Sequence, residues 1–123
     1  EPPKVFTFKI INEYPHDITS YTQGLEFFNG ELYESTGQYG ESKLRKLNYK
    51  TGEVLKNINL ENQYFGEGLT ILNDNIYKLT WQKNIGLVYD LESFKKKGKT
   101  EIKKKFQVEQ TIQIHGPAPP RYL

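Results

Sequence analysis

The feature that most constrains this chain is a sequence repeat with a period of 44 residues. When residues 24–36 are aligned with residues 68–80 without a gap, five of the thirteen positions are identical. The identical pairs are Gly24 with Gly68, Leu25 with Leu69, Asn29 with Asn73, Tyr33 with Tyr77, and Thr36 with Thr80. So many matches without a gap indicate one structural unit that is used twice.

Each unit is predicted to be a series of short β-strands separated by turns, because helical periodicity is absent and β-branched and aromatic runs alternate with turn residues. Asn29-Gly30 separates two such runs, and both residues tolerate the positive φ of a tight hairpin. Gly52 marks a second turn at residues 50–53. The first unit is therefore predicted to be a four-stranded meander, with strands at residues 24–28, 31–36, 43–49 and 54–60.

Four strands in a period of about 40–45 residues are typical of β-propeller blades, which bury their faces by stacking on neighbouring blades. The predicted fold class is therefore all-β with propeller blades, and one large meander sheet or a sandwich is the alternative. We expect about two to two and a half blades in a single partial propeller domain over residues 1–123. Its parts are a first blade at 13–60, a second blade at 61–103, and a divergent strand with a proline-rich tail at 104–123.

Segments outside the repeat carry three further expectations. Val5–Ile11 is predicted to be a strand that ends at the turn residues Tyr14-Pro15-His16-Asp17. Apolar residues recur on even positions from Phe106 to Ile114, which predicts one more strand. The start Glu1-Pro2-Pro3 is what a trimmed mature terminus looks like, so a secreted or periplasmic protein is expected.

Composition excludes several kinds of site and partner. The chain has no cysteine and only two histidines, which rules out disulfides and leaves no ligand cluster for zinc. Its formal charge is only +2, and the seven lysines between Lys95 and Lys105 have too few interleaved aromatics for a nucleic-acid platform. No run is long and apolar enough to be a transmembrane helix. We therefore expect no metal in the chemistry and neither a nucleic-acid nor a membrane partner.

An ordered series of short motifs runs from residue 14 to residue 94. The series is Tyr14-Pro15-His16-Asp17, Tyr21-Thr22-Gln23-Gly24-Leu25, Leu32-Tyr33-Glu34-Ser35-Thr36-Gly37, Tyr39-Gly40, Ser42-Lys43-Leu44-Arg45, Phe65-Gly66-Glu67-Gly68-Leu69-Thr70 and Leu79-Thr80-Trp81-Gln82. It resembles the plant-type glutaminyl cyclases, a glutamine cyclotransferase family that also occurs in bacteria. The resemblance implies a five-bladed propeller that converts N-terminal glutamine of a peptide to pyroglutamate and releases ammonia. It implies no cofactor for this acyl transfer, and allows a structural calcium ion in the central channel.

The implied chemistry asks for one proton-transferring group. The α-amine of the substrate attacks its own γ-carboxamide, so the protein must hold the side chain in attack geometry while a carboxyl group shuttles a proton. The resemblance places the catalytic glutamate at Glu67, between two glycines that do not crowd a substrate. Desolvation by Phe65 and Trp81 would favour the protonated acid. The alternative is an ordinary channel-facing glutamate.

Four further residues are predicted to line the substrate pocket. Gln23 starts the strand equivalent to that of Glu67, so the two should be neighbours on adjacent inner strands, where the amide of Gln23 can hold the substrate. Trp81 offers a flat apolar wall with one indole donor, and Tyr21 and Phe65 add aromatic lining. A hydrogen bond across the channel for Gln23 and core packing for Trp81 are the alternatives.

Two polar clusters of the motif series are predicted to be structural. His16 is expected to belong to the turn before the first blade and not to act as a base. Glu34, Ser35 and Thr36 are expected to make hydrogen bonds within the fold, because no histidine is placed by sequence to activate Ser35.

The length of the chain leaves three explanations open. Five blades of this period need about 220 residues, whereas the chain has 123. The sequence belongs to a longer enzyme, which we favour, or to a half-propeller that closes by association, or to a remodelled protein without activity. A complete chain of two blades would associate with itself through open blade faces. The alternative function is a non-catalytic binding module whose lysine-rich segment contacts an acidic partner.

Overall fold

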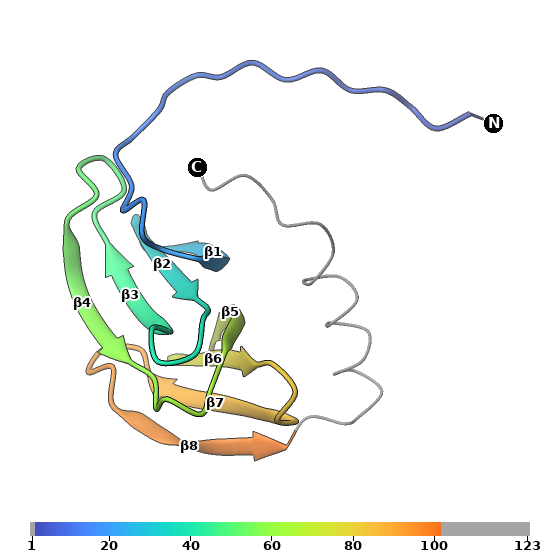
Figure 1. Ribbon diagram of the computed structural model, residues 1–123. Coiled ribbons are helices and arrows are strands. Elements are labelled where there is room, and N and C mark those ends of the chain that lie inside the picture. Colours follow the sequence, from blue (N-terminus) through green and yellow to red (C-terminus); the bar gives the residue numbers. More distant parts are fainter. Residues whose placement is uncertain (1, 102–123) are drawn as a thin grey trace.

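The computed structural model describes residues 2–101, and its regular structure is entirely β-strand (Figure 1). The strands form two antiparallel four-stranded sheets in the simple orders β1-β2-β3-β4 and β5-β6-β7-β8. They are β1 (Thr22–Phe28), β2 (Glu31–Thr36), β3 (Lys43–Leu47), β4 (Val54–Asn59), β5 (Gly66–Leu72), β6 (Asn75–Thr80), β7 (Ile85–Asp90) and β8 (Lys96–Glu101). Among the described residues there is no helix that could cross a membrane.

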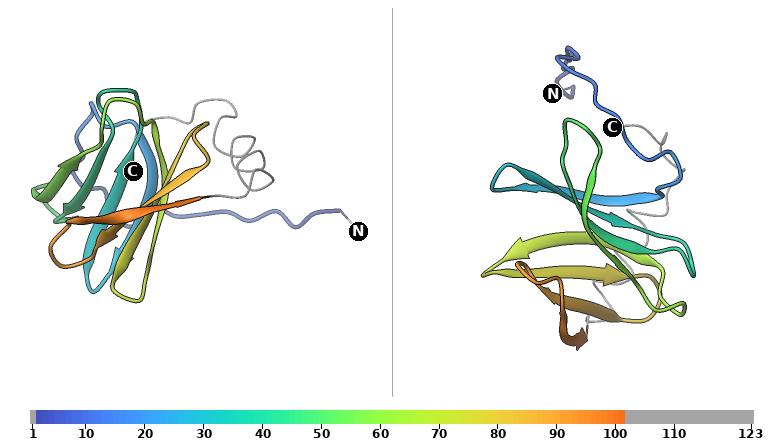
Figure 2. Two further views of the ribbon diagram at one scale, coloured as in Figure 1. Left: turned by 90° about the horizontal axis from the view of Figure 1, so that it is seen from below. Right: turned by 90° about the vertical axis from the view of Figure 1, so that its left-hand side faces the viewer.

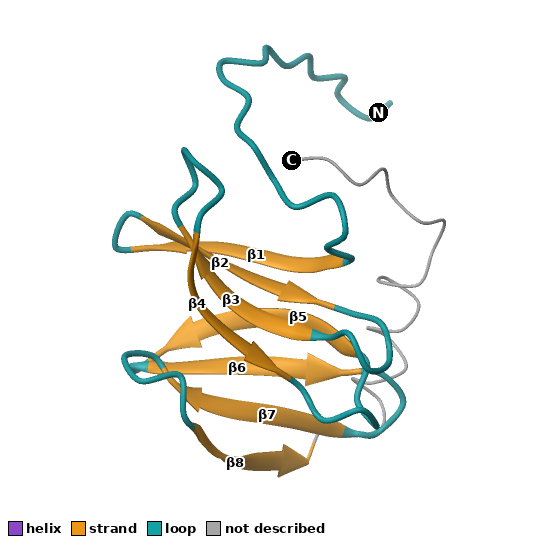
Figure 3. Ribbon diagram, turned by 60° about the vertical axis from the view of Figure 1, so that its left-hand side comes forward, coloured by secondary structure: helices purple, strands orange, loops and turns teal. Residues whose placement is uncertain are grey.

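The two sheets lie as separate neighbouring layers, which Figure 2 and Figure 3 show from different sides. Their first strands approach closely, since a Cβ atom on Gly24 of β1 would lie 3.0 Å from the main-chain nitrogen of Leu69 in β5. Their outer strands are further apart, and a pocket of about 640 Å³ opens there between β4 and the β7–β8 hairpin. Sheets that touch at inner strands and separate outwards are neighbouring propeller blades. The all-β blade prediction is confirmed, and the alternative of one continuous meander sheet is wrong.

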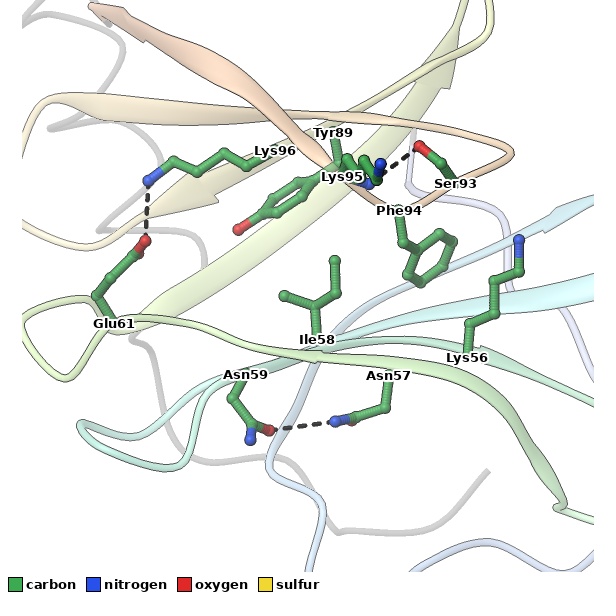
Figure 4. Close-up of a pocket in the computed structure, with 10 residues that line it drawn as sticks. All are labelled: Lys56, Asn57, Ile58, Asn59, Glu61, Tyr89, Ser93, Phe94, Lys95 and Lys96. Atoms are coloured by element: carbon green, nitrogen blue, oxygen red, sulfur yellow. Dashed lines mark hydrogen bonds and ion pairs between the residues drawn. The ribbon is translucent and has the colours of Figure 1, made fainter.

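The outer pocket is lined by polar and aromatic side chains of both sheets (Figure 4). Lys56 and Ile58 reach it from β4, and Tyr89 comes from β7. Lys96 spans it to form an ion pair with Glu61 at 3.0 Å. None of the predicted site residues lines this pocket.

The β1–β2 and β5–β6 hairpins, which are the inner hairpins of the two blades, confirm the predicted turn chemistry. Asn29 and Gly30 have φ angles of 49° and 78°, and the equivalent Asn73 and Asp74 have 50° and 62°. Asn and Asp tolerate this left-handed region better than other residues with a side chain. The second unit therefore makes the same turn without a glycine.

The outer strands of the first sheet are one or two residues shorter than predicted. β3 ends at Leu47, because the Asn48 carboxamide oxygen accepts hydrogen bonds from the amides of Lys50 and Thr51 at 3.0 and 3.2 Å. A side chain that caps the turn in this way competes with the strand ladder. The predicted turn glycine, Gly52, has a φ of 78°.

The hydrophobic core lies between the two sheets and the segment that connects them. Its fully or almost fully buried side chains are Tyr33, Leu44, Leu60, Tyr64, Ile76, Leu87, Tyr89 and Phe94. Both sheets and the connecting segment contribute, so neither sheet has a complete core of its own. Burial against a neighbour is what a blade requires.

The prediction of a strand at Val5–Ile11 is wrong. This segment has no strand partner within the described residues, and Figure 1 shows it as an extended trace that leaves the sheets. Phe6, Phe8 and Ile11 are 83%, 88% and 84% exposed. Sequence propensity alone does not make a strand, because the ladder needs a second chain segment to pair with. The predicted strand at Phe106–Ile114 and the proline-rich tail lie outside the described residues.

The strands of each sheet are consecutive in the sequence. Those of the first sheet fall within 13–60 and those of the second within 61–103. Before β1 the chain passes the β3–β4 turn at Pro15, whose carbonyl oxygen would lie 2.8 Å from a Cβ atom on Gly52. Glycine at position 52 is therefore required both by its φ and by this close approach.

Candidate active site

Gln23 and Glu67 lie at equivalent irregularities in the two inner strands. The pairing of β1 with β2 shifts register between Thr22 and Gly24, and the pairing of β5 with β6 shifts between Gly66 and Leu69. Such β-bulges turn a side chain out of the regular pleat and are common beside active sites. Because β1 and β5 pack against each other, both bulges lie where the two blades meet.

Glu67 is almost completely buried, with 2% of its surface exposed, whereas Gln23 is half-buried. Its two glycine neighbours differ in surroundings. A Cβ atom on Gly66 would clash with the carbonyl oxygen of Thr36, whereas one on Gly68 would meet no atom within 4 Å. Space for a ligand beside Glu67 is therefore on the Gly68 side.

Tyr21, Phe65 and Trp81 form one aromatic cluster. The ring of Phe65 meets those of Tyr21 and Trp81 edge to face, with centroids 6.0 and 5.4 Å apart. Tyr39 completes the cluster at 5.5 Å from Phe65 and 6.4 Å from Trp81. Sequence reasoning gave Tyr39 no role, although it lies in the motif series, because a loop residue has no strand register to place it.

The main chain beneath this cluster repeats with the sequence period. The amide of Gly37 donates to the carbonyl of Tyr21 at 2.9 Å, and the amide of Trp81 donates to that of Phe65 at 2.9 Å. Position 37 must be small, because a Cβ atom there would clash with the Phe65 ring and lie 2.9 Å from the Gly66 carbonyl oxygen. The equivalent position in the second blade holds the indole of Trp81. At this pair of equivalent positions the first blade thus supplies space and the second blade supplies a ring.

Behind Glu67 lies a buried lysine that sequence reasoning missed. Lys78 of β6 and Ser35 of β2 have no exposed surface. The Lys78 Nζ donates to the Ser35 hydroxyl, and this hydroxyl donates to the main-chain carbonyl of Glu67. Burial lowers the pKa of Lys78 to about 7, while the charges of Glu67 and Glu34 act in the opposite direction. The repeat held a signal, because Lys78 aligns with Glu34, another charged residue in a predicted strand.

Glu34 binds the segment that precedes the first blade. Its Oε2 is 2.6 Å from the Nε2 of His16 and accepts a hydrogen bond from the Thr22 hydroxyl at 2.6 Å. Thr36 binds the amide of Lys43 at 2.9 Å. Together with Ser35, these residues make the structural hydrogen bonds that were expected of them, and His16 holds the entering chain against the blade.

No group of three or more His, Cys, Asp or Glu residues that could hold a metal ion occurs within residues 2–101. The calcium ion that the resemblance allows stays a prediction. The roles assigned to Glu67, Gln23, Phe65, Trp81 and Tyr21 stay predictions, which the geometry makes testable.

Comparison with known proteins gives three findings. A family model described as glutamine cyclotransferase matches residues 1–106. The glutaminyl-peptide cyclotransferase of Arabidopsis thaliana is 40% identical over 94 residues, which are 76% of this chain and 29% of that protein. The crystal structure of Myxococcus xanthus glutaminyl cyclase superposes with a TM-score of 0.67 at 32% identity, covering 76% of this chain and 39% of that one.

The present chain thus spans less than two fifths of the length of either relative. Within that span, the matches in sequence and in structure agree with the motif series. The resemblance inferred from the motifs is confirmed, and the chain belongs to the glutamine cyclotransferase family.

Proposed function

We propose that the protein is a glutaminyl-peptide cyclotransferase, which cyclises the N-terminal glutamine of a peptide to pyroglutamate and releases ammonia. The observation that carries this proposal is the position of Glu67. A buried carboxyl group lies on a β-bulge of an inner strand, beside the inner strand that presents Gln23. Membership of the family supports the reaction class.

The reaction needs one bond to form and one to break. The neutral α-amine attacks the γ-carboxamide carbon, and the new C–N bond gives a tetrahedral centre whose nitrogen is positively charged. Glu67 accepts a proton from this nitrogen and returns it to the carboxamide nitrogen, which leaves as ammonia when its C–N bond breaks. The carboxylate is regenerated, so the cycle consumes no other reactant.

Gln23 and the aromatic cluster supply binding and geometry. The carboxamide of Gln23 can donate to the substrate carbonyl and accept from its amine, which favours the folded conformer needed for ring closure. Phe65 is buried, and Tyr21, Tyr39 and Trp81 surround it. Their apolar faces exclude water from the reacting atoms and strengthen the electrostatic interactions of Glu67.

The partner in this proposal is a peptide or protein with N-terminal glutamine. If two blades are all that the protein has, a second partner is another copy of the chain. Exposed apolar side chains at Phe6, Phe8 and Ile11, and the unpaired outer edge of β8 in the described structure, are features that promote association. A mass measurement in solution distinguishes a dimer or larger assembly from a monomer.

The test is ammonia release from a short peptide with N-terminal glutamine, followed with mass spectrometry of the peptide. We expect turnover with this peptide and none with the same peptide after acetylation of its N-terminus, because the acetylated amine cannot attack. A peptide with N-terminal asparagine controls for general deamidation. A folded sample without turnover on the glutamine peptide would contradict the proposal and favour the non-catalytic binding module.

A further inference from the structure

A lysine is buried between the two sheets, directly against the residue that precedes Glu67. The Nζ of Lys78 lies 3.2 Å from the carbonyl oxygen of Lys43 and 3.4 Å from that of Thr36. A Cβ atom on Gly66 would lie 2.7 Å from this Nζ. The lysine head group therefore occupies the space that the missing side chain of Gly66 leaves open. Burying an ammonium group is costly, so this position calls for compensating interactions.

Ser35 connects the lysine to the main chain of Glu67. Its hydroxyl accepts a hydrogen bond from Lys78 and donates one to the Glu67 carbonyl. A hydroxyl has a single proton, and the lysine occupies a lone pair, so the proton is directed at the Glu67 carbonyl. These two bonds fasten the β5 bulge to β2 of the other blade. They fix the point from which the Glu67 side chain projects.

Lys78 is also coupled to Glu67 by charge. The acidic groups that face it are Glu67 from β5 and Glu34 from β2, and His16 lies on the far side of Glu34. From β3, the main-chain carbonyl of Lys43 accepts a hydrogen bond from the lysine. Both carboxylates favour the ammonium form of Lys78, and by reciprocity the ammonium favours the carboxylate form of Glu67. This influence opposes the cost of burying the Glu67 carboxylate, whose residue is 2% exposed.

We propose that Lys78 is a positioning residue for Glu67, orienting the Ser35 hydroxyl that holds the β5 bulge and keeping Glu67 as the carboxylate that accepts the amine proton. The inference rests on the proposed function. Lys78 itself does not touch the substrate. Its influence passes through one hydroxyl and through the electric field between the two blades.

The first test measures the coupling without any turnover. In the full chain labelled with ¹³C-lysine, the Lys78 signal is identified by its loss in Lys78→Gln and is followed against pH. We expect its midpoint at about 7 in the natural chain. Glu67→Gln removes a negative charge and is expected to move this midpoint to lower pH by about one unit. Glu61→Gln, which removes a carboxylate paired with Lys96 on the outer side, is the matched control and should leave it unchanged.

The second test measures the consequence for the reaction. In Lys78→Gln the amide can still bind Ser35 but the charge is lost. We expect kcat to fall about tenfold with little change in KM, and the acidic limb of its pH profile to move to higher pH because the carboxylate of Glu67 is less favoured. A purely structural lysine would change stability and leave this limb in place.

The two tests separate this inference from the proposed function. A Lys78 signal that titrates at the usual lysine pH and ignores Glu67→Gln overturns the inference, as does a folded Lys78→Gln with natural kcat and an unmoved acidic limb. Absence of turnover in the natural chain, with the coupling present, overturns the proposed function and leaves the lysine–glutamate pair established.

Discussion

The first and second blades share one backbone and differ in the side chains that meet between them. Both make the same inner hairpin, the same bulge and the same hydrogen bond beneath the aromatic cluster. Equivalent positions, however, hold different residues. They are Thr22 and Gly66, Gln23 and Glu67, Glu34 and Lys78, and Gly37 and Trp81.

This difference shows how a repeated unit becomes asymmetric without a change of fold. At the face between the blades, one unit supplies a carboxylate where the other supplies an ammonium, and one supplies space where the other supplies a ring. A repeat with identical side chains would place like charges against each other at this buried position. Substitutions that disturb this asymmetry should therefore lower the free energy of unfolding or the activity measurably.

The largest expected effect concerns Lys78 and pH. Its pKa is lowered from 10.5 to about 7 in the folded protein, so between these values the unfolded chain binds a proton that the folded chain does not. The contribution of this group to the free energy of unfolding should therefore increase as pH rises through that window, by up to about 1.4 kcal/mol per pH unit. Lys78→Met should lose this contribution. Denaturant unfolding of both proteins at several pH values checks it, and parallel profiles would contradict it.

The next largest effect is expected at Gly66. Gly66→Ala places a methyl group against the carbonyl of Thr36 and 2.7 Å from the Lys78 Nζ, where the rigid backbone cannot yield. We expect a loss of about 3 kcal/mol in unfolding free energy. The matched change in the first blade, Thr22→Ala, removes one hydrogen bond to Glu34 and should cost about 1 kcal/mol. Equal costs at the two positions would show that the bulges are not differently packed.

A smaller effect is expected at Gly37, where the ring of Phe65 occupies the space that a side chain would fill. Gly37→Ala should displace this ring and lower the free energy of unfolding by about 2 kcal/mol, because the added methyl overpacks the cluster. Thermal unfolding measures the loss, and the near-ultraviolet circular dichroism of the aromatic cluster should change with it. Gly68→Ala adds the same methyl where no atom lies within 4 Å and serves as the control. An unchanged spectrum in Gly37→Ala would place the ring elsewhere.

The smallest effect is expected from the ion pairs at the entrance to each blade. Asp17 binds Arg45 at 3.0 Å, and the equivalent Glu61 binds Lys96 at 3.0 Å. Hydrogen bonds from Thr19, helped by Arg45, hold the pKa of Asp17 well below its usual range, so its contribution is lost as pH falls below the unfolded value of 3.8. Asp17→Asn and Glu61→Gln should each cost less than about 1 kcal/mol in unfolding measurements at neutral pH. A cost of Asp17→Asn that does not fall with added salt would argue against a surface pair.

The repeat and the turn residues allowed the sheets to be predicted from the sequence, because hairpin chemistry is local. Asn29-Gly30 defines a tight turn whatever surrounds it, and the period carries that result to Asn73. The strand at Val5–Ile11 was wrong for the opposite reason. Its residues have high β-propensity, but pairing depends on a neighbouring edge that the sequence does not reveal.

The candidate site was predictable only in part. The period alone put Gln23 and Glu67 on equivalent inner strands, and family resemblance gave them roles. Lys78 and Tyr39 were missed, since a buried lysine is uncommon and its burial follows from how two blades stack. No local pattern states which charged residue of a strand faces the next blade.

The central claim is that the equivalent positions 23 and 67 have different roles. Gln23 binds the substrate, and Glu67 transfers the proton. The most direct measurement is kcat and KM for a peptide with N-terminal glutamine in the natural chain, Glu67→Gln and Gln23→Ala, each shown to be folded. Glu67→Gln should lose about 100-fold or more in kcat, whereas Gln23→Ala should act mainly by raising KM. A Glu67→Gln protein that keeps its full kcat would contradict the account.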